Sequence, residues 1–221
     1  MVMEILLPRF GREGWWPAES PFEAAVGAIL TQNTNWRNVE KAIGNLKGVV
    51  SLTPTSLLSL HADQLETLIR PAGFYKQKAE RLKALSKLLS KDFGGEVERL
   101  GSIEMDRARS ILLGIKGIGR ETADAILLYA CHLPSFVVDA YTFRMLRRLQ
   151  IREEEDYEEV RELFHNCLGR NADILSLAHA AIVEFSKQIC TKSPLCSRCP
   201  IYTLCPFPSK QKKRRSEQQD E

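Results

Sequence analysis

Apolar residues recur every three or four positions along almost the whole of this 221-residue chain, which is the spacing of one face of an α-helix. The segment from Ser20 shows it clearly: a capping box with proline in the first helical position precedes an apolar face of Phe22, Val26 and Ile29. No segment shows the sustained alternation of polar and apolar residues that a half-buried strand requires. The sequence therefore predicts an all-α fold.

About ten helices are expected, and the chain contains no internal repeat. They cover approximately residues 20–32, 35–46, a short stretch from 53, 61–69, a long stretch after Gly73, 105–113, 120–131, 140–150, 156–168 and 174–189.

Nothing in the sequence predicts a membrane protein. No apolar run approaches the roughly 20 residues that a membrane-spanning helix needs. The first residues carry an acid at Glu4 and their apolar stretch ends at Pro8, which does not fit a signal peptide. We therefore expect a cytoplasmic protein, and nothing in the sequence requires more than a monomer.

The formal net charge of +3 points only weakly to nucleic acid. The tail of residues 208–221 holds five basic and three acidic side chains and contributes +2, which leaves +1 for residues 1–207. We expect this tail to be disordered, and it either adds salt-dependent attraction to phosphate or is only a solvated chain end. The function has to be sought in local motifs.

Four of the six cysteines fall within sixteen residues, at a spacing of C-x5-C-x2-C-x5-C. In a cytoplasmic protein this density indicates a metal centre rather than disulfides. Zinc is usually held by two short knuckles set farther apart, whereas one central C-x2-C with wider flanking gaps suits a cubane with one ligand for each iron. The pattern favours a [4Fe–4S] cluster over zinc, with four ligands: Cys190, Cys196, Cys199 and Cys205.

A glycine-rich turn, Leu113-Gly-Ile-Lys-Gly-Ile-Gly-Arg120, joins two of the expected helices. Gly117 and Gly119 leave no side chain over the backbone N–H groups that begin the next helix, and such exposed N–H groups bind phosphate. A hairpin of this kind would hold a DNA backbone without reading its bases. Taken alone, the motif is equally compatible with an ordinary glycine turn.

About twenty residues after this turn, Asp139 ends an apolar stretch and begins a helix. Its simplest role is that of an N-cap. Capping N–H groups would also hold the carboxylate ionised and fixed in place, as an oxocarbenium-like sugar beside it would require. The two roles are compatible.

These motifs, together with the Thr31-Gln-Asn-Thr34 turn and the segment from Gly73 to Ala79, occur in the order seen in the helix-hairpin-helix DNA glycosylases. From about residue 20 to 206 the chain resembles the endonuclease III branch of that superfamily. The resemblance implies two lobes: a six-helix barrel over 20–133, and a [4Fe–4S] cluster lobe built from 1–19 and 134–207. It also implies that the partner is double-stranded DNA with a damaged nucleotide turned out into a pocket.

Carried over by position, Asp139 matches the catalytic aspartate of the family, and Gln32 matches the residue that fills the gap left by the flipped base. The first cysteine gap is one residue shorter than the family's usual C-x6-C. The DNA-binding hairpin of the family corresponds to Lys116, Gly117, Gly119 and Arg120.

The most informative departure from the endonuclease III pattern is Glu121, which follows Gly119-Arg120 where the pattern has a lysine. The amine of that lysine attacks C1′ and opens a Schiff-base route to strand cleavage. A carboxylate cannot form this imine. The resemblance and this departure together predict a monofunctional glycosylase that leaves an abasic site.

Losing the lysine favours bases that leave easily. N-alkylated purines such as 3-methyladenine or 7-methylguanine carry a positive charge, which an electron-rich aromatic pocket recognises. Gly14-Trp15-Trp16-Pro17 and Trp36 resemble the 3-methyladenine DNA glycosylases, which makes all three tryptophans pocket candidates, with Lys187 as a further one. The alternative is that the tryptophans are packing aromatics and that Lys187 only complements a helix C-terminus.

Three functions remain open. The first is a monofunctional alkylpurine glycosylase of base excision repair. The second is an endonuclease III-like glycosylase for oxidised pyrimidines or mismatched bases. The third is a catalytically silent iron–sulfur DNA-binding protein, against which the retained Asp139 argues. The four histidines show no ligand spacing, and the sequence assigns them no chemistry.

Overall fold

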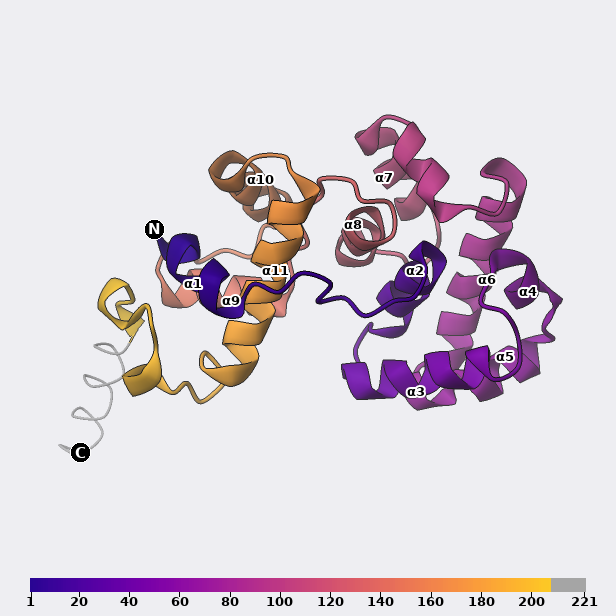
Figure 1. The fold of residues 1–221 in the computed structure, drawn as a ribbon, viewed down its shortest axis with the longest axis horizontal. Coiled ribbons are helices and arrows are strands. Elements are labelled where there is room, and N and C mark those ends of the chain that lie inside the picture. Colours follow the sequence, from indigo (N-terminus) through magenta and orange to yellow (C-terminus); the bar gives the residue numbers. More distant parts are fainter. Residues whose placement is uncertain (208–221) are drawn as a thin grey trace. The chain divides into compact units, whose positions relative to one another are not determined.

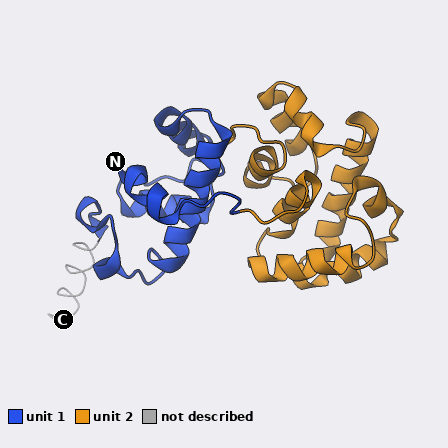
Figure 2. Ribbon diagram, in the orientation of Figure 1, with its two compact units in different colours: residues 1–15, 136–221 blue, residues 16–135 orange. Residues whose placement is uncertain are grey.

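The computed structural model describes residues 1–207, and within that range it contains helices and no strand (Figure 1). The predicted all-α fold is confirmed. Two compact units divide the chain: unit 2 is the continuous segment 16–135, and unit 1 combines residues 1–15 with the chain from 136 onward (Figure 2). The predicted disordered tail at 208–221 lies outside the described residues.

Unit 2 carries the α2–α8 helices and two short 3-10 helices. In chain order they are α2 (Pro21–Leu30), α3 (Trp36–Lys47), α4 (Pro54–Ser59), α5 (Ala62–Leu68), η1 (Arg70–Ala72), α6 (Tyr75–Asp92), η2 (Val97–Ser102), α7 (Met105–Leu113) and α8 (Arg120–Tyr129).

Helix α2 is the centre of unit 2. It is buried on all sides from Phe22 to Leu30, because α3, α6 and α8 pack around it. The predicted cap forms: the Ser20 hydroxyl accepts a hydrogen bond from the Glu23 N–H at 3.1 Å, and Pro21 occupies the first helical position. This buried helix ends at Leu30, directly before the turn that holds Gln32.

Unit 1 is built around α11. Its elements are α1 (Val2–Phe10), α9 (Ala140–Arg148), α10 (Tyr157–Leu168), α11 (Ala172–Gln188), η3 (Cys196–Arg198) and η4 (Tyr202–Leu204). Helix α1 was not predicted, because Pro8 lies inside it and normally disfavours a helix interior. Packing against α11 compensates: Leu6 is fully buried, and the rings of Phe10 and Phe185 meet edge to face at 5.6 Å.

The boundary between the units differs by a few residues from the expected lobes. We expected residues 1–19 in the cluster lobe, but Trp16 belongs to unit 2, where its ring stacks on Tyr129. At the other boundary, unit 1 resumes at Phe136, whereas the prediction placed the change at 134.

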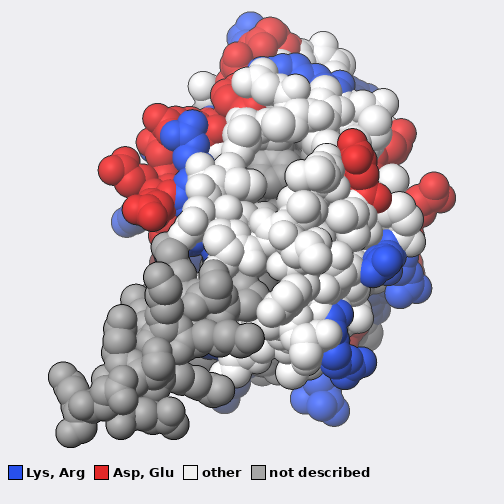
Figure 3. All heavy atoms as spheres, turned by 90° about the vertical axis from the view of Figure 1, so that its left-hand side faces the viewer, with Lys and Arg blue, Asp and Glu red and all other residues white. Residues whose placement is uncertain are grey.

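Charged side chains form separate local groups. On the face shown in Figure 3, uncharged side chains occupy most of the middle, and acidic and basic side chains lie at its margins. At the upper and left margins of this face, acidic and basic side chains lie next to one another (Figure 3). Among the described residues, no helix has the length and apolar character needed to cross a membrane.

Candidate functional site

Asp139 lies at the N-terminus of α9 and is almost completely buried, with 9% of its surface exposed. Its Oδ1 accepts hydrogen bonds from the Thr142 N–H at 2.8 Å and the Thr142 hydroxyl at 2.9 Å. Its Oδ2 lies 3.6 Å from Nε2 of His179 on α11. The residue is thus an N-cap, as its sequence position predicts, with its second oxygen directed to a histidine.

These contacts keep the carboxylate ionised. Burial alone would raise the pKa of Asp139, but the charge of the nearby His179, together with the two Thr142 hydrogen bonds, outweighs it and holds the pKa below its usual range. Sequence analysis missed His179, because it lies forty positions from Asp139 and no ligand-like spacing marks it. Its only signal was that it lies on the apolar face of α11.

Two of the predicted pocket residues, Trp15 and Lys187, lie together in unit 1 beside His179. The Trp15 indole N–H donates to Glu184 at 3.0 Å, and the Lys187 ammonium lies 5.5 Å from the centre of the Trp15 ring. The ring of His179 meets Trp15 edge to face, with 5.5 Å between centroids. A chain of contacts therefore connects Lys187 through Trp15 and His179 to Asp139.

The other two tryptophans lie together in unit 2. Trp16 stacks on Tyr129 with 4.5 Å between ring centroids and meets Trp36 edge to face at 5.2 Å. Gly27 of α2 provides the space, since a Cβ there would lie 3.3 Å from the Trp36 ring. The Trp36 indole nitrogen is buried and has no hydrogen-bond partner in the described part of the chain. All three tryptophans are half-buried, so none is an ordinary core residue.

The predicted hairpin joins α7 to α8. Gly117 adopts a left-handed φ of +89°, and nothing lies within 4 Å of where a Cβ of Gly119 would stand. Lys116 and Arg120 are exposed on either side. The N-terminus of α8 has no side-chain cap, which leaves its N–H groups available to an anion.

A buried ion pair braces the two helices of the hairpin. Arg109 of α7 donates to both oxygens of Asp124 on α8, at 2.8 and 3.0 Å. The Ser135 hydroxyl donates to the same carboxylate at 2.5 Å. This bidentate pair fixes α7 against α8 and with them the turn between.

The Thr31–Thr34 turn lies against this hairpin. The Gln32 amide donates to the Gly117 carbonyl at 3.2 Å and to the Thr122 hydroxyl at 2.7 Å, and its oxygen accepts from Arg81 of α6. Two residues predicted to contact DNA from different motifs are therefore adjacent. Directly before α6, Phe74 is 62% exposed and has a left-handed φ of 45°, a feature that the sequence did not reveal.

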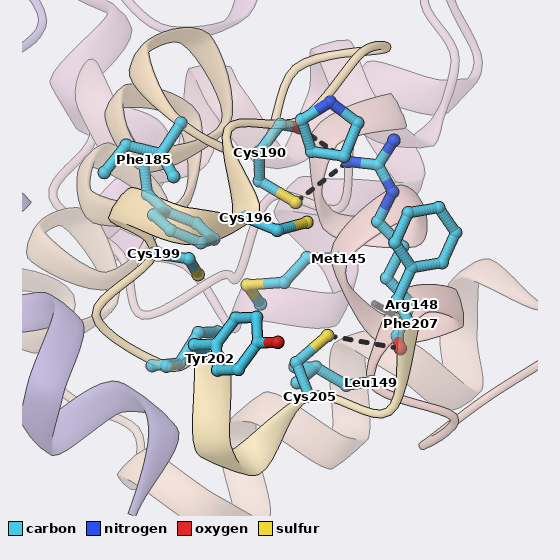
Figure 4. A pocket seen from close by; sticks show the side chains of 13 residues that line it. Met145, Arg148, Leu149, Phe185, Cys190, Cys196, Cys199, Tyr202, Cys205 and Phe207 are labelled. Atoms are coloured by element: carbon cyan, nitrogen blue, oxygen red, sulfur yellow. Dashed lines mark hydrogen bonds between the residues drawn. The ribbon is translucent and has the colours of Figure 1, made fainter. Parts of the chain in front are cut away.

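All four predicted cysteine ligands line one pocket in unit 1, and their sulfur atoms face into it (Figure 4). The other walls are mainly apolar, with Met145 and Leu149 from α9 and Phe185 from α11. All four cysteines are free of disulfides. In the described residues, no three His, Cys, Asp or Glu side chains converge closely enough to hold a single metal ion.

The donor set and walls of this cavity suit an iron–sulfur cluster. Burial is the main cause that raises the pKa of the Cys199 and Cys205 thiols, and the neighbouring cysteines raise it further. Four thiolates so close together would need a positively charged centre, which an iron–sulfur cluster would supply. Within residues 1–207, no carboxylate or imidazole lines the cavity in competition with sulfur.

Arg148, which the sequence did not single out, holds the first turn of the cysteine loop. It donates to the Cys190 sulfur at 3.0 Å and to the carbonyls of Cys190, Thr191 and Lys192 at 3.0, 2.7 and 3.1 Å. Its guanidinium also lies 4.7 Å from the centre of the Phe207 ring. One α9 side chain thus fixes the segment that carries the first ligand.

The chain matches the HhH-GPD superfamily of base excision DNA repair proteins over residues 26–169, and it belongs to that superfamily. It is therefore a DNA glycosylase of base excision repair.

Two curated relatives cover most of the chain. A protein of Methanocaldococcus jannaschii described as a DNA repair glycosylase is 48% identical over 88% of this chain and 90% of its own. Endonuclease III of Thermotoga maritima is 33% identical over 80% of this chain and 78% of its own.

Solved structures give the same fold. A 3-methyladenine DNA glycosylase of H. pylori bound to 1,N6-ethenoadenine is 35% identical, with a TM-score of 0.73 over 85% of this chain and 96% of its own. An endonuclease III–DNA complex has a TM-score of 0.81 over 96% of this chain and 95% of its own, at 24% identity.

Proposed function

We propose that this protein is a monofunctional DNA glycosylase that hydrolyses the N-glycosidic bond of flipped-out alkylated purines and leaves an abasic site. The observation that carries the proposal is the buried Asp139 carboxylate, which His179 and Thr142 hold ionised. A fixed negative charge stabilises the positive charge that develops on the sugar as the base leaves.

The two carboxylate oxygens would have separate tasks. Oδ1 is committed to Thr142, and Oδ2 faces His179 and is the oxygen that acts on the sugar or on water. The C1′–N bond breaks and its electron pair leaves with the base. A water oxygen then bonds to C1′, and its proton passes to Asp139.

Glu121 supports hydrolysis without lyase chemistry. It lies exposed in the first turn of α8, next to the hairpin, and carries a carboxylate. A Schiff base with C1′ requires an amine, and a carboxylate provides none. The abasic site would therefore be the final product.

The aromatic groups support an alkylated purine as the substrate. A methylated purine is cationic, so its base leaves with little acid catalysis, and half-buried indole rings attract it by roughly 0.5–2 kcal/mol. The Trp36 indole N–H is a buried donor for an acceptor on the base. A similar protein of H. pylori is a 3-methyladenine DNA glycosylase, which also supports an alkylated purine as the substrate.

Duplex DNA would be held at the hairpin. The exposed N–H groups of α8 and the side chains of Lys116 and Arg120 suit one stretch of phosphate backbone. The exposed Phe74 ring is an apolar wedge of the kind that enters between base steps, and Gln32 would fill the gap.

We further propose that the cysteine cavity holds a [4Fe–4S] cluster with a structural role. The four thiols line one cavity from different sides, as a cubane with one ligand on each iron requires. Cys190, Cys196, Cys199 and Cys205 would bind it, and the cluster would fix the loop that presents Lys192 and Arg198 to phosphate.

The substrate is tested with duplex oligonucleotides that each carry one defined lesion, followed by alkali to cleave abasic sites. The panel contains 7-methylguanine, a stable 3-methyladenine analogue, 1,N6-ethenoadenine, an oxidised pyrimidine, and uracil or thymine opposite guanine. We expect alkali-dependent cleavage at the alkylated purines. Cleavage only at the pyrimidines would support the second function, which the similarity to endonuclease III of T. maritima favours.

The monofunctional step is tested in the same reactions with borohydride. We expect no trapped covalent adduct and no strand break without alkali. A trapped adduct would show that another amine serves as the nucleophile. No excision from any duplex, despite tight lesion binding, would leave the catalytically silent DNA-binding function.

A further inference from the structure

The Gln32 side chain is fully engaged on the hairpin. Its amide nitrogen uses both hydrogens, one on the Gly117 carbonyl at 3.2 Å and one on the Thr122 hydroxyl at 2.7 Å. Its oxygen accepts from Arg81. The proposed role of Gln32 is to enter the gap beside a flipped base, so these three hydrogen bonds must open before it can act.

Arg81 contacts the hairpin itself. Its guanidinium fills the space where a Cβ of Gly117 would stand, with Cζ 2.9 Å from that position. Gly117 is therefore required twice, once for its φ of +89° and once because the guanidinium lies over it. This places a cation at the turn whose N–H groups are suited to phosphate.

Among the described residues, no carboxylate lies within ion-pair distance of Arg81, which is half-buried. Lys78, one turn earlier on α6, is a second cation close enough that Arg81 contributes to lowering its pKa. A half-buried guanidinium at a hairpin, with a like charge beside it and only an amide to bind, is suited to an arriving phosphate.

We propose that Arg81 is a positioning residue that couples backbone binding at the hairpin to the release of Gln32. In the DNA-free protein the guanidinium holds Gln32 on Gly117. When a DNA phosphate reaches the hairpin, the guanidinium pairs with the phosphate and its hydrogen bond to Gln32 is lost. The side chain can then enter the duplex once its two remaining hydrogen bonds, to Gly117 and Thr122, open. This inference rests on the proposed function, since it assigns the order of events on DNA.

The test is a double-mutant cycle on a duplex that carries a tetrahydrofuran abasic analogue opposite 2-aminopurine. The 2-aminopurine fluorescence reports insertion beside the gap, and anisotropy gives the dissociation constant. The variants are Gln32→Ala, Arg81→Met and the double variant, each checked for folding by circular dichroism. Lys116→Met, alone and with Gln32→Ala, is the matched control: Lys116 lies on the same hairpin but makes no hydrogen bond to Gln32.

Coupling predicts that the loss of affinity caused by Gln32→Ala grows by about threefold or more in the Arg81→Met protein, because Gln32 no longer has to leave Arg81 on binding. The same loss should keep its wild-type size in the Lys116→Met protein. Arg81→Met should also lower the slope of log affinity against log salt by about one. Arg81→Lys keeps the charge without the planar fork, so it should retain the salt slope and lose the coupling.

An equal Gln32→Ala penalty in the wild-type and Arg81→Met proteins would overturn the inference, as would an unchanged salt slope or full coupling in Arg81→Lys. These results are distinct from failure of the proposed function. If the wild-type protein excises a lesion while the affinity effects of Gln32→Ala and Arg81→Met simply add, only the proposed coupling between Arg81 and Gln32 is wrong. If it neither excises any lesion nor prefers the abasic duplex to an undamaged one, the proposed function fails first.

Discussion

At the scale of single residues, Asp139 shows how one side chain can stabilise a helix and serve chemistry at the same time. Its N-cap position could be predicted from the local sequence, because a cap depends only on the next few residues. The contact between Asp139 and His179 could not be predicted in this way. Helical spacing shows which face of α11 carries His179, but it does not show which element packs against that face. The ionised state of Asp139 depends on this distant contact.

Replacing His179 with glutamine should shift the acid limb of the pH–rate profile for base excision to higher pH. In the wild-type protein the pKa of Asp139 is lowered, so the carboxylate is lost only as the pH falls below its ordinary range. Without the histidine charge that pKa rises, and activity should fall at a higher pH. The measurement is the rate of base release against pH in single-turnover reactions, corrected for loss of the base without enzyme.

His165→Gln is the matched control for this experiment. His165 is also buried in unit 1, but it contacts the Phe136 N–H and Glu162 instead of Asp139. Its replacement should leave the acid limb in place. An unchanged acid limb in His179→Gln would show that Thr142 alone keeps Asp139 ionised.

At the scale of elements, α6 shows what amphipathic spacing predicts and what it omits. The apolar residues expected to face the core, Ala79, Leu82, Leu85 and Leu89, are all buried. The same helix also buries Lys78 completely, which its charge did not suggest. The ammonium donates to the carbonyls of Leu30 and Ala72, both at 2.8 Å, and so ties the end of α2 to the start of α6.

Lys78→Met should change how stability depends on pH. Burial, with a smaller effect of Arg81, lowers the pKa of Lys78 from 10.5 to about 8, so the unfolded chain holds this proton more tightly than the folded protein does. Lys78 therefore makes the free energy of unfolding rise between about pH 8 and 10.5, by at most about 3 kcal/mol. The variant should lack this rise, as measured by urea unfolding across that range.

Lys83→Met controls for the loss of hydrogen bonds. Lys83 lies on the same helix and also donates to two carbonyls, those of Leu58 and Leu60, but it is only half-buried. Its replacement should preserve the rise with pH. A Lys78→Met protein with the wild-type pH dependence would contradict the account of a buried, destabilised cation.

The cysteine loop depends on α9 as well as on its own sequence. Arg148→Met removes the hydrogen bonds to three successive carbonyls and to the Cys190 sulfur. Protein purified without oxygen should then hold less iron per chain, and its visible absorbance should fade faster in air. Metal analysis and absorbance measure both effects.

Arg144→Met provides the comparison, because Arg144 donates to the Cys190 carbonyl and weakly to Ser186 without reaching Thr191 or Lys192. It should lose less iron than Arg148→Met. Equal losses would mean that the turn is not held by Arg148, and stoichiometric zinc in the wild-type protein would refute the iron–sulfur cluster.

At the scale of the whole molecule, the helices and motifs could be read from the sequence because caps, glycines and apolar spacing act locally. Contacts between segments that are distant in the sequence could not be predicted in this way. The Gln32–Gly117 contact, the Asp139–His179 pair and the Arg148 anchor each join elements whose sequence separation carries no pattern. Helix α1 escaped prediction for the same reason, since it depends on packing against α11.

The net charge illustrates the same limit. A total of +3 is a sum over groups of opposite sign, so it says little about where a polyanion would bind. The hairpin and Arg81 were located by motif and by contact instead.

The central claim, hydrolytic excision that depends on Asp139, is tested most directly on one duplex carrying a single 7-methylguanine. Wild-type protein and Asp139→Asn are compared for released base and for strand breaks with and without alkali. The account predicts that wild-type protein releases the base and that breaks need alkali. It predicts that Asp139→Asn binds the duplex but excises at least about 10²-fold more slowly. Full excision by Asp139→Asn, or breaks without alkali in the wild-type reaction, would contradict it.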